Sequence, residues 1–117
     1  MSGGTPDEFT VRAQQVADAY VVVPSGELDL GTVDQLRAVL AARPPASARL
    51  VLDLRELTFF DTSGMRVVVE TLEEAERAGV GLSLVRGSDA IQRLFALAGI
   101  EDRLPFVDDG VDARRAS

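Results

Sequence analysis

"LVLDLRELTFFDTSGMRVVV", residues 50–69, is the stretch from which the fold of this chain can be inferred. It opens with a short apolar run, which is typical of a strand buried on both faces of a parallel sheet. It closes with Met65, Val68 and Val69, whose spacing predicts the apolar face of an amphipathic helix. The small and polar residues Asp61–Gly64 separate the two patterns and form the candidate functional loop.

The rest of the chain alternates between strand and helix patterns. Runs rich in β-branched and apolar residues predict strands at residues 9–14, 19–28, 48–54, 80–87 and 103–107. Helical spacing, polar caps and glycine stops predict helices at residues 30–43, 63–78 and 88–99. The order β-β-α-β-α-β-α-β predicts an α/β fold with a mixed, mostly parallel sheet of four to five strands and helices packed against it. We expect a disordered N-terminus at 1–7, one domain at 8–107 and a polar tail at 108–117.

The composition excludes most familiar catalytic sites. The 117 residues are 46% hydrophobic and 26% charged, as in an ordinary globular domain, and include no cysteine or histidine. All twelve positive charges are arginine, because the sequence has no lysine either. The chain therefore cannot form a Ser–His–Asp triad, a thiolate metal site or a Schiff base. We expect a binding protein without metal or cofactor rather than an enzyme.

The charge balance limits the partners. A net charge of −7 disfavours nucleic-acid phosphates and anionic membranes, and the arginines form no run that offsets it. No apolar stretch is long enough to span a membrane, and the first nine residues lack the pattern of a signal peptide. We expect a cytoplasmic protein that binds neither nucleic acid nor membrane directly, with its oligomeric state left open.

The residues of the polar loop permit two interpretations. Ser63 is expected to be the N-cap of the following helix. Its hydroxyl would accept a hydrogen bond from a backbone amide, which would stabilise the fold by about 1 kcal/mol. Alternatively, the Ser63 hydroxyl accepts a covalent phosphate, a group that is best tolerated at a helix N-terminus. Gly64 favours the second interpretation, because a helical glycine costs up to ~1 kcal/mol relative to alanine and suits a close approach to the backbone.

Three segments together resemble the STAS domain of anti-sigma factor antagonists. Residues 50–69 resemble its signature, in which a strand ending in Asp-Leu leads through a short loop to Asp-Ser/Thr-Ser-Gly at a helix start. "SGELDLGT", residues 25–32, resembles the loop after its second strand, and "IQRLFALAGIEDRLPF", residues 91–106, resembles its third helix and closing strand. The resemblance covers about residues 8–107 in the right order.

This resemblance implies a phosphorylatable binding protein. Ser63, directly before the glycine of the motif, takes the position of the phosphate acceptor, and Thr62 stands where serine is common. The unmodified form would bind an anti-sigma factor that is itself a serine kinase, and so release a sigma factor. Phosphorylation would dissociate that complex, and a serine phosphatase would remove the phosphate and restore the binding form. The residues implied in partner binding are Asp29, Thr32, Asp61, Thr62, Ser63, Gly64 and Met65.

Other interpretations stay open at the level of sequence. Asp29 can equally end a strand, Thr32 can cap a helix, and the helical spacing of Met65 favours the core. The whole domain can also serve as a docking module of a transport or signalling complex in which Ser63 is never modified. A small carboxylate-dependent enzyme or nucleotide binder is disfavoured, because the sequence has no phosphate-binding glycine loop.

Overall fold

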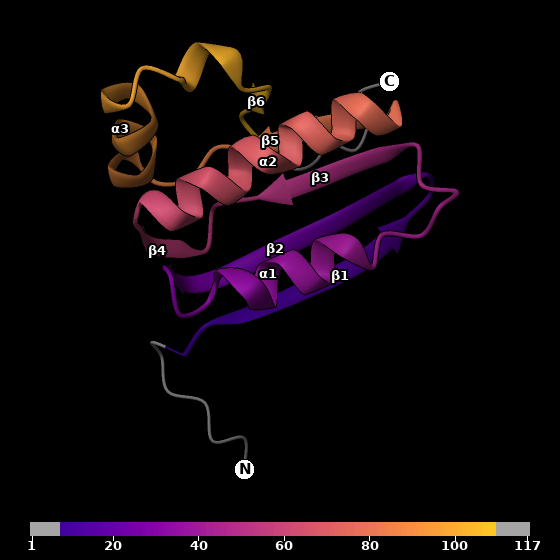
Figure 1. Cartoon of the computed structure of the whole chain (residues 1–117), viewed down its shortest axis with the longest axis horizontal. Helices are drawn as coiled ribbons and strands as arrows, with labels where there is room; N and C mark the ends of the chain where they lie inside the picture. The colour runs from indigo at the N-terminus through magenta and orange to yellow at the C-terminus, as the bar shows by residue number, and fades with distance from the viewer. Residues whose placement is uncertain (1–7, 110–117) are drawn as a thin grey trace.

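The computed structural model describes residues 8–109, in which the chain alternates between strands and helices (Figure 1). The elements are β1 Thr10–Val16, β2 Ala19–Leu28, α1 Val33–Ala41, β3 Arg49–Asp53, β4 Leu57–Phe60, α2 Thr62–Ala78, β5 Gly81–Val85, α3 Asp89–Leu97, a 3₁₀ turn Glu101–Arg103 and β6 Phe106–Val107. This order contains one strand, β4, that the sequence patterns do not predict. The expectations for residues 1–7 and 110–117 lie outside the described residues.

One mixed sheet organises the domain. Its strand order is β1-β2-β3-β5-β6, with β4 paired to β2 off this path. The hairpin of β1 and β2 is antiparallel, and the other pairs, β2–β3, β2–β4, β3–β5 and β5–β6, are parallel. The predicted α/β fold with a mixed, mostly parallel sheet is therefore confirmed, with six described strands in place of four to five.

The long strand β2 has two different parallel neighbours. Its first half, Ala19–Val22, pairs with β3, and its end, Gly26–Leu28, pairs with β4. Pro24, which has no amide to donate, lies between these two pairings. Because β4 runs alongside the end of β2, it delivers the start of α2 to the carboxyl end of that strand.

The helices α1 and α2 lie on the same face of the sheet, as Figure 1 shows, and enclose the main core there. Alternate residues of β2 and β3, such as Val22 and Leu52, point into this core. Phe95 of α3 extends the core with ring contacts to Phe60, centroids 4.9 Å apart, and to Phe106, 5.2 Å apart. A smaller cluster on the opposite face of the sheet contains Ala19, Val21, Val51 and Val85.

The buried face of α2 differs from the expected one. The sequence spacing favours Met65, Val69 and Leu72 alongside Val68 and Ala75. The buried residues are Gly64, Val67, Val68, Thr71 and Ala75. Thr71 can be buried because its hydroxyl donates a hydrogen bond to the Val67 carbonyl at 2.7 Å. The spacing of apolar residues does not take a buried threonine into account, and the buried face it predicts is therefore shifted by about one residue.

The predicted end of α2 and the predicted start of α3 agree with the structure. Gly79 closes α2 in the left-handed conformation, with φ of 71°. Ser88 caps α3, and its hydroxyl accepts the Ile91 amide. These signals are local, which is why the sequence alone identifies them.

Candidate functional site

Asp61, not Ser63, is the N-cap of α2. Its carboxylate Oδ1 accepts the amide of Ser63 at 2.8 Å and the amide of Gly64 at 3.3 Å. The helix therefore begins at Thr62, and Ser63 lies within its first turn. This corrects the expected cap: an aspartate two residues earlier already takes the amides, so the Ser63 hydroxyl is not needed for capping.

Removal of the Asp61 carboxylate tests this cap. We expect Asp61→Ala to lower the free energy of unfolding by about 1 kcal/mol, because the amides of Ser63 and Gly64 lose their acceptor. Asp61→Asn is the matched control and keeps most of the stability, since its side-chain oxygen can still accept. Urea unfolding measures both, and equal losses in the two variants would contradict the capping role.

The Ser63 side chain is available at the surface. It is half-buried, whereas the neighbouring Thr62 is exposed. Within residues 8–109, the Ser63 hydroxyl makes no hydrogen bond to another protein group. It lines an open cavity of about 120 Å³ between the starts of α1 and α2, whose lining residues are Leu30, Val33, Arg37, Thr62, Ser63 and Arg66. A neutral hydroxyl is therefore free to be bound or modified there.

Asp29 and Thr32 hold the loop between β2 and α1. The Asp29 carboxylate accepts the Gly31 amide at 2.9 Å. The Thr32 hydroxyl donates to the Glu27 carbonyl at 2.8 Å and accepts the Asp29 amide at 2.9 Å. Thr32 occupies the N-cap position of α1 without bonding to the helix amides, so its expected capping bond is not formed. Both side chains organise the loop from within.

That loop presents Leu30 to solvent, with 77% of its surface exposed. Leu30 also lines the cavity beside Ser63. No sequence pattern singles out this residue, because the predicted helix over 30–43 includes it, whereas α1 begins only at Val33. Its position between Asp29 and Gly31 was the signal that it lies in a loop. The exposed leucine adds an apolar contact beside the hydroxyl.

Gly64 and Met65 differ in their relation to the surface. Gly64 is buried, and a Cβ atom built on it would lie 3.0 Å from both the Leu28 carbonyl oxygen and the Phe60 Cβ. The close approach expected at this glycine thus comes from the domain's own β2 and β4 rather than from a partner. Met65 is half-buried and packs against the main core. The packing of both residues against the domain fixes the position of the first turn of α2, which carries Ser63.

The charges around Ser63 come from α1 and α2. Arg37 Nη1 lies 3.0 Å from Asp34 Oδ1, and Arg37 Nη2 lies 3.2 Å from Glu70 Oε1. Hydrogen bonds to Glu70 and then Asp34 raise the pKa of Arg37 above its ordinary value, so it stays charged. The sequence spacing favours Arg66 as the partner of Glu70, but the structure pairs Glu70 with Arg37 across the helices.

The described part of the chain shows no sign of a metal or membrane-spanning element. Residues 8–109 contain no cluster of three or more acidic, histidine or cysteine side chains placed to hold a metal ion. No helix among them combines the length and the apolar character needed to cross a bilayer.

The family follows from comparison with known proteins. The family model described as STAS domain matches residues 10–113 of this chain. The chain belongs to the STAS family. The resemblance inferred from the sequence motifs is thereby confirmed.

Several proteins that are similar to this STAS domain are named as antagonists of anti-sigma factors. An anti-sigma-B factor antagonist of Staphylococcus aureus (strain NCTC 8325 / PS 47) is 32% identical over 94 residues, covering 80% of this chain and 86% of that protein. The crystal structure of an anti-sigma factor antagonist from Mycobacterium paratuberculosis has a TM-score of 0.79 and 29% identity, and covers 94% of both chains. A putative anti-sigma factor antagonist from Thermotoga maritima also has a TM-score of 0.79, with 90% and 95% covered, and at 17% identity it shows the fold alone.

Proposed function

We propose that this STAS domain is an anti-sigma factor antagonist regulated by phosphorylation of Ser63. The unmodified form binds an anti-sigma factor, which is itself a serine kinase, and thereby releases a sigma factor. The protein is a regulator and kinase substrate rather than an enzyme. A serine phosphatase restores the binding form, and these partners place the protein in the bacterial cytoplasm.

The relatives support the class of function. Proteins named anti-sigma factor antagonists match this chain over most of its length, both in sequence and in structure. The observation that carries the proposal is the placement of Ser63: a hydroxyl free of internal hydrogen bonds, in an open cavity next to the exposed Leu30. A partner can cover both groups at once, burying an apolar side chain and a small neutral one.

Phosphorylation would convert that surface into one that resists burial. The γ-phosphoryl group of ATP would pass to Ser63 Oγ, forming an O–P bond while the bond to ADP breaks and the hydroxyl proton passes to a base of the kinase. The product carries nearly two negative charges beside the Asp61 carboxylate. An interface packed around a neutral hydroxyl would have to desolvate or expel this group, at a cost of about 2–5 kcal/mol.

Labelling by the cognate kinase tests the assignment of Ser63. With ATP and the anti-sigma factor, we expect one phosphate per chain in the unaltered protein and none in Ser63→Ala, as measured by intact mass. Thr62→Ala is the matched control, because it removes the neighbouring exposed hydroxyl and leaves Ser63 in place. Labelling that persists in Ser63→Ala would contradict the proposal.

The same experiment separates the alternative function. A STAS domain that serves purely as a docking module of a transport or signalling complex would bind its partner yet take up no phosphate at either hydroxyl. Tight nucleotide binding or ATP hydrolysis by the isolated chain would instead favour the remaining alternative, a small carboxylate-dependent enzyme or nucleotide binder.

A further inference from the structure

We propose that Arg37 and Arg66 form an arginine clamp that holds the phosphate of phosphoserine at position 63 within the same domain, and that Arg37 leaves Glu70 to do so. This inference rests on the proposed modification of Ser63. It assigns the two arginines, which no sequence motif singled out, to the binding of a phosphate monoester.

The cavity beside Ser63 has the room and the lining for such a group. Its volume is about 120 Å³, and Ser63, Arg37 and Arg66 all line it. A single water needs only about 10–15 Å³ of such space, so the cavity has several times the room of one water beside the Ser63 hydroxyl. Arg66 follows Ser63 by three residues on α2, a spacing at which side chains are neighbours on a helix surface.

Three of the amides at the start of α2, those of Ser63, Gly64 and Met65, are already engaged and do not compensate the charge of the phosphate. Asp61 Oδ1 already accepts the amides of Ser63 and Gly64, and the Asp61 carbonyl accepts the amide of Met65 at 3.1 Å. The carboxylate of Asp61 also repels a second anion placed beside it. Positively charged side chains must therefore balance the phosphate.

Arg66 is available for this role. It is exposed, and in residues 8–109 no hydrogen bond or ion pair engages its guanidinium group. A guanidinium binds phosphate in a bidentate manner, with charge-assisted hydrogen bonds stronger than those between neutral groups. Arg66 can thus turn to the phosphate without breaking another contact.

Arg37 is engaged by contacts that exchange easily. Its partners Asp34 and Glu70 have side chains 92% and 49% exposed, and Arg37 itself is 41% exposed. Ion pairs at such exposure contribute about 0–1 kcal/mol, because water and salt screen them. A phosphate dianion carries more charge than either carboxylate, so we expect it to take Arg37 from Glu70.

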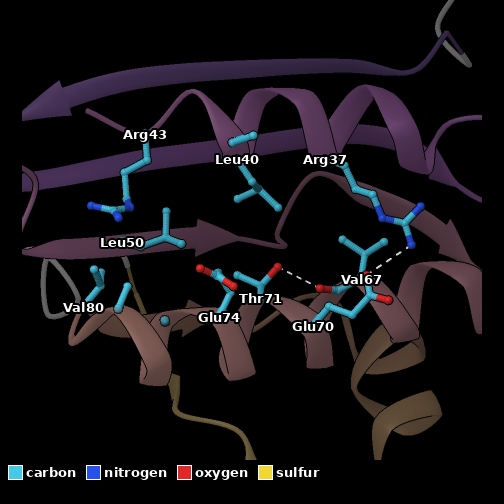
Figure 2. Close-up of a pocket in the computed structure, with 12 residues that line it drawn as sticks. Arg37, Leu40, Arg43, Leu50, Val67, Glu70, Thr71, Glu74 and Val80 are labelled. Carbon is cyan, nitrogen blue, oxygen red and sulfur yellow. Dashed lines mark hydrogen bonds and ion pairs between the residues drawn. The ribbon is translucent and has the colours of Figure 1, made fainter. Parts of the chain in front are cut away.

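The exchange would also alter a second cavity. Figure 2 shows Arg37 reaching from α1 toward Glu70 of α2, at one end of the residues that line this second cavity. This mostly apolar cavity, of about 220 Å³, lies between the two helices. Departure of Arg37 removes the ion pair that bridges the helices at this end. Modification at Ser63 would therefore change the contacts between α1 and α2 at this cavity.

The test places phosphoserine at position 63 during translation, so that no kinase or partner is needed. A ³¹P NMR titration then measures the second pKa of the phosphate. Asp61, which caps the same helix, and Asp34 and Glu70, the partners of Arg37, raise this pKa, whereas Arg37 and Arg66, which line the cavity, lower it. We expect Arg37→Gln and Arg66→Gln each to raise it, and the double variant to raise it by about 1 unit.

Arg77→Gln is the matched control. Arg77 lies on the same helix, eleven residues beyond Arg66 and roughly 16 Å along its axis, so its loss should leave the phosphate pKa unchanged. The side-chain Nε–H signals of Arg37 and Arg66 in ¹⁵N spectra provide the second readout and should shift when the phosphate is present.

The outcomes are distinct from those of the proposed function. Equal phosphate pKa values in the unaltered protein and the double variant would overturn the clamp, even if phosphorylation at Ser63 controls partner binding. An effect of Arg66→Gln alone, with an unmoved Arg37 signal, would overturn the exchange with Glu70. Conversely, a clamp found in the installed phosphoprotein stands even if no kinase labels Ser63.

Discussion

We expect Ser63→Asp to weaken binding of the proposed partner, an anti-sigma factor, by roughly 100- to 1,000-fold, which corresponds to about 3–4 kcal/mol. The physical reason is desolvation: a carboxylate in the half-buried position of Ser63 must lose water when the partner covers it and Leu30. Asp61 is already an anion at the adjoining helix cap and already accepts the amides of Ser63 and Gly64, so these two amides are not available to the new charge. Isothermal titration calorimetry with the purified partner measures the change.

Ser63→Asn is the matched control for charge. Asparagine has nearly the same size and shape as aspartate but is neutral, so we expect it to retain binding within about tenfold. Circular dichroism and thermal unfolding should show both variants folded, because the Ser63 hydroxyl makes no hydrogen bond within residues 8–109. Equal binding by the two variants would refute a charge switch, and unchanged binding in both would favour the passive docking module.

Gly64→Val is expected to lower the free energy of unfolding by about 3 kcal/mol. Its Cβ atom would lie 3.0 Å from the backbone oxygen of Leu28 and from Phe60 Cβ, where little can move. The helix start must then shift away from the ends of β2 and β4, taking Ser63 with it. Gly64→Ala should lose about 1–2 kcal/mol, because the same close contact is offset by a better helix propensity.

Glu73→Val on the same helix is the control for introducing valine. Glu73 is exposed, so the change should cost no more than about 0.7 kcal/mol through helix propensity. Urea unfolding measures all three variants. If Gly64→Val is as stable as Glu73→Val, the start of α2 is not packed as tightly against β2 and β4 as the structure indicates.

Sequence patterns located most of the elements because their signals are local. The β-branched residues of 19–28 predicted β2, and Ser88 and Gly79 marked a helix start and a helix end that the structure confirms. Three segments taken together, residues 25–32, 50–69 and 91–106, indicated the family, which the STAS model confirms.

Other features depended on contacts that no local pattern encodes. β4 is only four residues long, and it is a strand because it pairs with the end of β2, some thirty residues earlier. The cap of α2 was assigned to Ser63 because both Asp61 and Ser63 are good caps in sequence, and only the backbone conformation separates them. The partner of Glu70 was likewise placed on its own helix, whereas Arg37 reaches it from α1.

The sequence by itself therefore determined the alternation of strands and helices, since caps, glycine stops and periodicity act within a few residues. Its resemblance to the STAS signature singled out Ser63 as the hydroxyl on which the proposed switch depends. Only the tertiary structure decided which groups surround that hydroxyl. Leu30 and Arg37 come to Ser63 because parallel pairing aligns the ends of β2 and β4 and because α1 packs beside α2 on one face of the sheet. Contacts over such separations depend on the packing of the whole domain, and no stretch of neighbouring residues specifies them.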